Sequence, residues 1–344
     1  MDPVFTLTLR IVHSVGIARP KSKPRYTVLS LDSALREKVL YSSDRAQIVQ
    51  NINGYLLNAD NVFIESRNKP ICDVPEIGMG TQPIDDGNYL FTDEMKAEFL
   101  KKEPMSEKYF HPWYGAQEFI NRSPRWCLWL GECPPNELQK MPYCMKRIKA
   151  VRDFRLSSKR TSTNKLADTP TRFQTENMPT GTYVVIPEVS SEKRKYIPMG
   201  YMDDTVLCSN KVRIMPNATL YHFGILESNV HMAWMRVVCG RLKSDYDYSI
   251  KIVYNNFPWP MHNEAQKEKI EQTAQGILDA RALYPDCSLA ALYDEVTMPP
   301  ELRKAHQAND RAVMQAYGFW GKLNTETACV AELMKMYQKL TERG

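Results

Sequence analysis

The chain has 344 residues, of which 43% are hydrophobic and 25% are charged. This balance is typical of globular proteins and disfavours a disordered chain. No run approaches the about 18 consecutive apolar residues that a membrane-spanning helix needs, so a transmembrane protein is excluded. The 45 Lys and Arg residues exceed the 40 Asp and Glu residues by only a small margin, which identifies no partner by itself.

The N-terminal sequence and the cysteines indicate the cellular compartment. The segment 1–15 alternates polar and apolar residues, and it lacks the basic start, the continuous apolar stretch and the cleavage site of a signal peptide. The eight cysteines are scattered without a C-x-x-C pair, which favours reduced thiols over a disulfide framework or a zinc ribbon. We therefore expect a cytoplasmic protein with no membrane partner.

The first 102 residues predict little regular structure. Residues 4–15 and 26–31 predict two strands joined by a basic hairpin at 19–25, which needs a larger sheet to pair with. Residues 51–90 are rich in Asn, Gly, Pro and Asp, and they predict irregular chain on a surface, with a surface turn at 78–80. Thr92 and the acids after it predict a capped helix that ends at about Lys102.

Short runs of β-forming residues follow, at 126–130 and between 182 and 254. They are WCLWL, TYVVIP, KYIPMGY, TVLC, KVRIMP, ATLYHFG and YSIKIVY, and one predicted helix at 228–238 interrupts them. The links are too short for parallel crossovers, which favours antiparallel pairing. After Pro260 the sequence predicts four helices, which begin at Asn263, Ser288, Pro299-Pro300 and about 325.

The expected fold class is therefore α+β, with a mixed, mostly antiparallel sheet domain followed by a helical C-terminal domain. The expected bounds are 1–50 for terminal strands of a preceding domain, 51–260 for the sheet domain and 261–344 for the helical domain.

Positive charge concentrates between Lys140 and Lys165, where nine basic residues accompany one acid. Apolar residues recur there at spacings of three and four, which predicts an amphipathic helix with a basic outer face; they are Met141, Met145, Ile148, Val151 and Phe154. A polyanion is the natural partner of such a face. A merely solvated charged face fits the charge pattern equally well.

Catalytic motifs are missing from the sequence. It contains no H-E-x-x-H, no G-x-S-x-G, no Walker loop and no clustered His and Cys residues with metal-ligand spacing. His222 and His231 are expected to be ordinary core or surface histidines. The segment 255–260 is superficially similar to a loop that grips a flipped adenine, but it lacks consecutive prolines, and we expect it to pack between two domains. No catalytic residue and no metal ligand is assigned.

Several runs carry a family resemblance: NINGYL at 51–56, NVFIESR at 61–67, RWCLWL at 125–130, PNATLYHFG at 216–224, HMAWMR at 231–236, CGRLKSD at 239–245 and YNNFPWP at 254–260. They resemble the C-terminal half of MmeI-like enzymes, which are bacterial single-chain restriction-modification proteins that methylate adenine N6 with S-adenosylmethionine. The resemblance extends from about residue 45 to about 340. The chain departs from the family pattern at Gly54, where Pro is more common, and this bears on loop stiffness.

The resemblance implies a target recognition domain followed by a helical C-terminal domain, with residues 1–45 as the last strands of a methyltransferase sheet. The family's S-adenosylmethionine loop, its Asn-Pro-Pro-Tyr loop and its nuclease motif would then lie upstream of residue 1. We therefore expect a fragment or a split specificity subunit that binds double-stranded DNA, docks on an upstream methyltransferase domain and catalyses nothing. S-adenosylmethionine would be a cofactor of the parent enzyme only.

Two alternatives remain open at this point. The chain could itself be an enzyme, with a constellation that the sequence does not reveal. It could also be a protein-interaction module in which the C-terminal helices dock a partner and the basic helix is only solvated. DNA binding at low salt separates the second alternative from the recognition hypothesis.

The expected DNA contacts fall into two groups. Phosphates should be bound by Lys146, Arg147, Lys149 and Arg152. For base reading, the resemblance points to the run 240–249. If this chain is extended, residues 243, 245 and 247 lie on the same face, because every second side chain of a strand points the same way.

In the resembling family, a Lys-x-Asp pair in this run goes with a guanine on the 3′ side of the methylated adenine. Lys243 could donate to O6 and N7 of that guanine, and Asp245 could accept from N4 of the paired cytosine. Asp247, with Lys211 from a neighbouring strand, would read the base pair on the other side of the adenine. An ordinary Lys/Asp surface pair, worth under about 1 kcal/mol, is the alternative.

Overall fold

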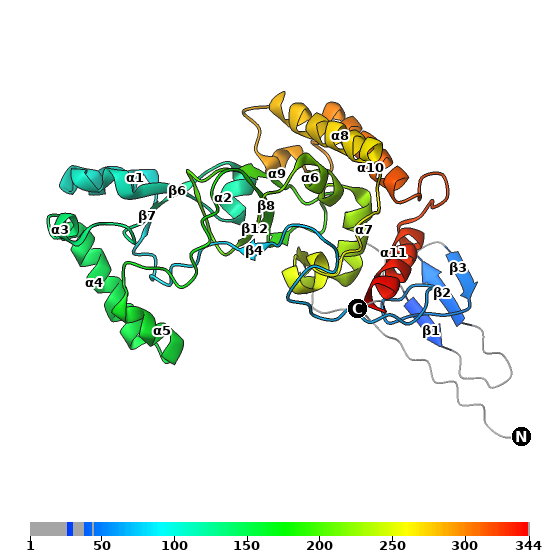
Figure 1. Ribbon diagram of the computed structural model, residues 1–344, viewed down its shortest axis with the longest axis horizontal. Helices are drawn as coiled ribbons and strands as arrows, with labels where there is room; N and C mark the ends of the chain where they lie inside the picture. The colour runs from blue at the N-terminus through cyan, green and yellow to red at the C-terminus, as the bar shows by residue number, and fades with distance from the viewer. Residues whose placement is uncertain (1–25, 30–37, 43–44, 343–344) are drawn as a thin grey trace, which may run out of the picture.

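The computed structural model describes residues 26–29, 38–42 and 45–342. The molecule is elongated (Figure 1). Helices α1, α3, α4 and α5 form one end, strands β4, β8 and β12 lie in the middle, and helices α7, α8, α10 and α11 lie towards the other end with a small N-terminal sheet (Figure 1).

The N-terminal sheet is antiparallel and consists of β1 (Tyr26–Leu29), β2 (Lys38–Ser42) and β3 (Arg45–Val49) in this order. The strand expected at 26–31 is confirmed for Tyr26–Leu29, whereas the strand expected at 4–15 and the hairpin at 19–25 lie outside the described residues. Residues 50–77 contain no helix or strand, as expected for this irregular segment.

The central sheet has four antiparallel strands in the order β10-β8-β12-β4. Its strands are β4 (Gly78–Met79), β8 (Tyr183–Pro187), β10 (Gly200–Met202) and β12 (Val212–Pro216). The surface turn expected at 78–80 is therefore wrong. The N–H of Gly80 donates to the carbonyl of Val212 at 3.1 Å, and a Cβ at Gly80 would lie 2.1 Å from the carbonyl oxygen of Ser209, so glycine permits an edge strand here.

A second sheet lies mainly in a separate lobe, which we call the distal lobe (residues 89–173); its parallel edge strand comes from residues 207–208, outside this range, and the helix at 116–121 packs on the main core. The strands are β5 (Leu90–Phe91), β6 (Phe110–Tyr114), β7 (Arg125–Leu128) and β11 (Leu207–Cys208), in the order β11-β6-β7-β5. The helices are α1 (Asp93–Lys102), α2 (Ala116–Asn121), α3 (Pro135–Leu138), α4 (Pro142–Ser157) and α5 (Thr161–Lys165). The hydroxyl of Thr92 caps α1, as the sequence predicts. The lobe has its own apolar core around Phe91, Leu128 and Val151.

The other helices share one continuous core with the central sheet. They are α6 (Leu220–Leu226), α7 (Asn229–Val238), α8 (Glu264–Ala282), α9 (Leu289–Leu292), α10 (Pro300–Ala316) and α11 (Glu326–Thr341). The four helices expected after Pro260 are confirmed, and Asn263, Ser288 and Thr325 cap three of them. Phe257 and Trp259 are buried in this core, which confirms that the segment 255–260 packs between the sheet region and the helices.

Two predicted strands are helical instead. ATLYHFG contributes α6, and YSIKIVY contains a short π-helical segment at Ile250–Tyr254. Most of α6 is buried, so its apolar residues show no one-sided period that would distinguish a buried helix from a buried strand. The α+β fold class is confirmed. None of the described helices has the length and apolar character that crossing a membrane requires.

Candidate nucleic-acid interface

The run that the sequence assigns to base reading forms a β-hairpin. Its strands are β13 (Gly240–Leu242) and β14 (Asp245–Asp247), and β14 also pairs with β9 (Val189–Ser190). Lys243 has a φ of +58°, so it lies in the left-handed region that a two-residue hairpin turn uses. The expectation that residues 243, 245 and 247 alternate along one extended strand is therefore wrong for Lys243 and holds for the other two.

One face of the hairpin carries the polar groups. Directly paired residues in antiparallel strands share a face, which places Leu242 with Asp245 and Asp247. Tyr246 lies on the opposite, buried face, with the Arg241 guanidinium 4.2 Å from its ring centre. The hairpin thus presents two carboxylates and an exposed Leu242 on one face, with Lys243 in its turn.

A cleft of about 580 Å³ lies beside this face. Leu242 and Val189 line it from the hairpin side, and Asn210 and Lys211 line it from the segment that enters β12. The opposite wall belongs to the region around the distal lobe, where the Arg125 Nε is 2.7 Å from Oε1 of Glu118. The cleft therefore joins the apolar side of the hairpin to polar groups of two other parts of the sequence; of the four predicted base-reading residues, only Lys211 lines it.

Backbone hydrogen bonds hold Lys211 close to the hairpin. The N–H of Glu188 donates to the carbonyl of Lys211 at 3.0 Å, and the N–H of Tyr248 donates to the carbonyl of Glu188 at 2.7 Å. Lys211 is thus connected through one residue to the end of β14, next to Asp247. Lys211 itself precedes β12, and the expectation that it reads a base pair together with Asp247 stays a prediction.

The charges on the cleft floor form a small network. The Glu188 carboxylate lies 2.6 Å from Nη2 of Arg213 and 3.4 Å from Nζ of Lys211. The Lys211 side chain is 67% exposed, so this pair is weak and its ammonium remains available to another acceptor.

Sequence reasoning missed Glu188 and Asn210. The sequence signal for Glu188 was its position directly after the buried β8 strand.

The basic segment forms α4, whose buried side is Cys144, Ile148, Val151 and Arg155. Lys146, Lys149 and Arg152 are exposed, and Lys149 forms a surface pair with Asp153 at 3.1 Å. The Arg147 guanidinium instead packs over the ring of Phe91, 4.9 Å from its centre. Three of the four predicted phosphate contacts thus lie on the exposed surface of the helix, and the fourth also supports the core of the distal lobe.

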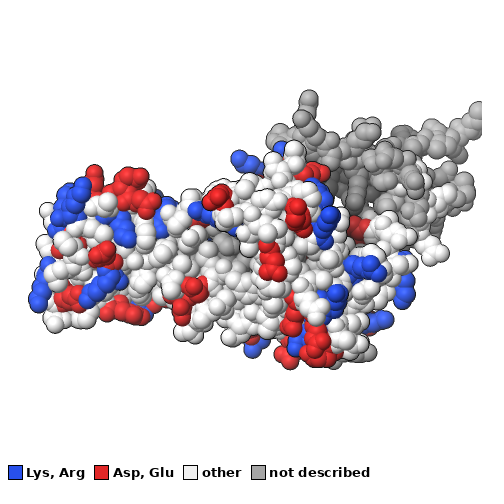
Figure 2. Space-filling model, turned by 90° about the horizontal axis from the view of Figure 1, so that it is seen from above, with Lys and Arg blue, Asp and Glu red and all other residues white. Residues whose placement is uncertain are grey.

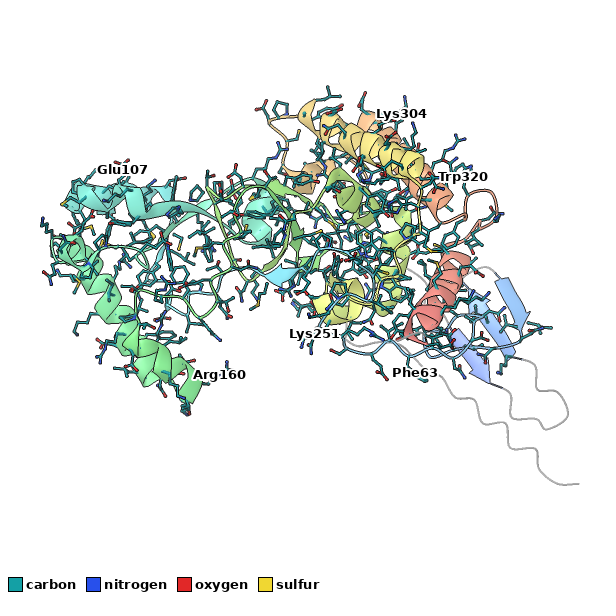
Figure 3. All side chains as sticks on the ribbon, in the orientation of Figure 1. Phe63, Glu107, Arg160, Lys251, Lys304 and Trp320 are labelled. Atoms are coloured by element: carbon teal, nitrogen blue, oxygen red, sulfur yellow. The ribbon has the colours of Figure 1, made fainter. Side chains whose placement is uncertain are left out.

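The predicted apolar face of α4 is partly wrong, because Met145 and Phe154 are exposed. Arg155, counted among the basic residues, is fully buried. Basic side chains at the distal end are interspersed with acidic ones (Figure 2), and Arg160 lies at the outer tip of this lobe (Figure 3). The positive charge is therefore less concentrated in space than in the sequence.

Arg155 stabilises the interior of the distal lobe and is not part of its surface. Its guanidinium donates to five backbone carbonyls, at 2.8 to 3.1 Å: Ile84, Leu166, Thr169, Pro83 and Arg172. Burial lowers the pKa of Arg155, while the hydrogen bonds to carbonyl oxygens satisfy its donors. This residue joins α4 to the chain on both sides of the lobe.

His222 and His231, which were expected to be ordinary core or surface histidines, have structural surroundings. Buried His231 contacts the carbonyl of Leu226 through Nδ1 at 3.0 Å and the hydroxyl of Tyr248 through Nε2 at 3.1 Å, and burial lowers its pKa to about 3. Burial also lowers the pKa of His222 to about 4. Within the described ranges, no group of three or more His, Cys, Asp or Glu residues could hold a metal ion.

Comparisons with known proteins agree with this architecture. The family model "MmeI, target recognition domain" matches residues 58–261, and "MmeI, C-terminal domain" matches residues 262–343. The chain is therefore a member of the MmeI family.

One curated relative and one solved structure define the similarity further. DNA methyltransferase A of Bacillus subtilis (strain 168) is 38% identical over 306 residues, which are 89% of this chain and 35% of that protein. The type IIL restriction-modification enzyme MmeI, solved in complex with DNA, superposes with a TM-score of 0.85 and 46% identity over 89% of this chain and 42% of its own. The chain thus spans about a third of the length of the curated relative.

Proposed function

We propose that this chain is the sequence-specific double-stranded DNA recognition module of a bacterial restriction-modification adenine-N6 methyltransferase, and that it carries no catalytic group itself. The observation that carries the proposal is the polar cleft beside the β13–β14 hairpin, within a chain that superposes on the recognition half of an enzyme solved with DNA. An upstream methyltransferase domain would receive the extruded adenine while this module holds the duplex.

Base reading is assigned to the hairpin and the cleft floor. Lys243 in the turn donates to O6 and N7 of a guanine, and Asp245 accepts from N4 of the paired cytosine. The Asp245 carboxylate accepts the N–H of Glu192 at 3.4 Å, which favours a fixed orientation of its oxygens. Asp247 and Lys211, joined through Glu188, read the pair on the other side of the adenine.

Phosphate binding is assigned to α4 in the distal lobe. Lys146, Lys149 and Arg152 are exposed on this helix, and Arg147 is partly exposed. Lysine and arginine side chains that neutralise phosphates release condensed counterions, so this part of the interface adds affinity without sequence information.

S-adenosylmethionine would supply the methyl group in the parent enzyme. The glycine segment 78–80 does not fit this cofactor, because it forms an edge strand whose Gly80 N–H is bonded to the carbonyl of Val212 and is not open to a ligand. We therefore derive no step through S-adenosylmethionine on this chain and place the cofactor on the methyltransferase domain of the parent enzyme.

Selection from a random pool of duplexes tests the proposal. The full chain should enrich one short sequence, and its affinity for that duplex should fall steeply between about 50 and 200 mM salt. Single-stranded DNA of the same sequence is the control and should bind more weakly. No affinity for any duplex at low salt would contradict the proposal and favour the protein-interaction alternative.

A further inference from the structure

The segment 191–195 reads Ser-Glu-Lys-Arg-Lys and follows β9 directly. It is attached to the base-reading hairpin by two hydrogen bonds. The N–H of Glu192 donates to Oδ1 of Asp245 at 3.4 Å, and the hydroxyl of Tyr246 donates to the carbonyl of Glu192 at 3.3 Å. Any ligand of this segment therefore lies close to the hairpin.

A second cleft, of about 260 Å³, separates this segment from the C-terminal helices. Basic side chains line it from both sides, namely Lys193, Arg194, Lys195, Arg236 and Arg303. Three acids also line it: Glu192, Asp294 and Glu295. The basic excess favours an anionic ligand.

Arg194 is the unusual member of this group. It is half-buried, and burial lowers the pKa of its guanidinium against the opposing charges of Asp245 and Asp294. Asp294 is itself engaged, since its Oδ1 accepts the N–H groups of Val296 at 2.9 Å and Thr297 at 3.3 Å. Across residues 26–29, 38–42 and 45–342, the Arg194 side chain makes no hydrogen bond and no ion pair.

Two buried arginines behave differently. Arg155 donates to five carbonyls, and Arg281 donates to Glu227, Tyr293 and the carbonyl of Met199. Nε of Arg67 and Nε of Arg213 are buried without a hydrogen-bond partner, whereas the Arg194 nitrogens remain in contact with solvent, so their N–H donors are open to an external acceptor at the cleft. Phosphate fits best, because its oxygens match the planar fork of N–H donors.

We propose that Arg194 binds a backbone phosphate of the DNA next to the base pairs that the hairpin reads, in a cleft to which the C-terminal helices contribute. This inference rests on the proposed DNA-recognition function. It adds a second phosphate contact, on the hairpin side of the recognition cleft, to those of α4. The exposed Lys193 and Lys195 flank Arg194 and extend the same basic strip.

The test compares the full chain with Arg194→Ala and Arg194→Lys on its selected duplex and on a random duplex. Arg194→Ala should weaken both by a similar factor of at least about tenfold at low salt, and reduce the slope of log affinity against log salt by about one. Arg194→Lys should restore the slope but only part of the affinity, because an ammonium cannot bind bidentately. Lys304→Ala is the matched control, since Lys304 is exposed on the outer side of α10 (Figure 3).

Three results would overturn the inference. An Arg194→Ala chain with the wild-type salt slope would remove Arg194 from the interface. Loss of inorganic phosphate binding in Arg194→Ala with unchanged DNA binding would assign the cleft to a free anion instead. A wild-type chain that binds no duplex at low salt would overturn the proposed function together with the inference, and this outcome differs visibly from a failure of the variant alone. Thermal unfolding of Arg194→Ala should match wild type, because the only hydrogen bond of Arg194 within the described residues is made by its backbone N–H, to the carbonyl of Ser191, and the substitution keeps it.

Discussion

Oε1 of Glu227 lies 2.7 Å from Nη2 of Arg281, and both side chains are buried where the sheet region meets the C-terminal helices. The same carboxylate oxygen accepts the N–H of Met199 at 2.8 Å, and the Tyr293 hydroxyl accepts from Nε of Arg281 at 2.8 Å. Burial raises the pKa of Glu227 to about 7 while the adjacent guanidinium opposes this shift. Through Tyr293, which lines the Arg194 cleft, the pair is connected to one wall of that cleft.

Glu227→Gln should therefore be strongly destabilising. It leaves the Arg281 charge buried without its counter-charge, a change that costs about 3–5 kcal/mol in comparable buried pairs. Urea unfolding at pH 8 measures the loss. Glu326→Gln is the control, because Glu326 pairs with Arg236 at a more exposed position and should cost under about 1 kcal/mol. Equal unfolding free energies for the two variants would show that the pair does not hold the junction.

Arg155→Lys should destabilise the distal lobe although the charge is kept. One ammonium has three donors on a flexible stem and cannot satisfy five carbonyls arranged around a planar guanidinium. Two or more orphaned carbonyls should cost at least about 2 kcal/mol. Arg152→Lys, one turn earlier on the exposed side of α4, should leave the unfolding free energy unchanged. The hypothesis fails if chemical denaturation does not separate these two variants.

Replacement of Lys146, Lys149 and Arg152 by Ala should weaken binding to every duplex alike. Loss of three phosphate contacts should lower the salt slope by about three, since each contact contributes about 0.9. Arg147 is left in place because its guanidinium packs on Phe91. The triple Ala variant of Lys269, Lys304 and Lys339 is the control with equal charge change. If both triple variants show the wild-type slope in anisotropy titrations, α4 is not part of the interface.

Acid should destabilise the fold before the surface carboxylates titrate. The folded pKa of His231 is about 3, well below the value of about 6.5 for an unfolded histidine. The unfolded state then binds the proton first, so this contribution to stability is complete above pH 6.5 and is lost as the pH falls towards 3. The slope should be up to about 1.4 kcal/mol per pH unit for this histidine.

His231→Gln isolates that contribution. Its unfolding free energy should fall less steeply than that of wild type between pH 6 and 4, and the two curves should run parallel above pH 7. Parallel curves over the whole range would show that His231 is not kept neutral by burial.

Local sequence signals predicted the helices but not all of the sheet. Thr92, Asn263, Ser288 and Thr325 each place a side-chain acceptor before a helix, and such caps depend only on neighbours in sequence. ATLYHFG gave the wrong element, because a helix buried on all sides has the composition of a buried strand. The choice between a helix and a strand for ATLYHFG depends on the tertiary fold and not on the segment itself.

The candidate site was predictable only where the sequence itself carried the signal. The family resemblance pointed to Lys243, Asp245, Asp247 and Lys211; the hairpin register places Asp245 and Asp247 on one face, and Lys211 lines the cleft next to it. The turn at Lys243 and the roles of Arg155 and Arg194 depend on contacts between distant segments. A charge in a sequence does not reveal whether carbonyls, a carboxylate or solvent will surround it.

The central claim is that the β13–β14 hairpin reads DNA sequence, and exchanging Lys243 and Asp245 for Glu and Arg tests it most directly. Lys243→Glu keeps a non-glycine residue at the positive φ of the turn, so the hairpin backbone should be retained. The exchange is made in an intact enzyme that carries this module, and the methylated sites are sequenced. The account predicts a change of guanine to cytosine at one position of the recognition sequence; an unchanged recognition sequence with normal activity would contradict it.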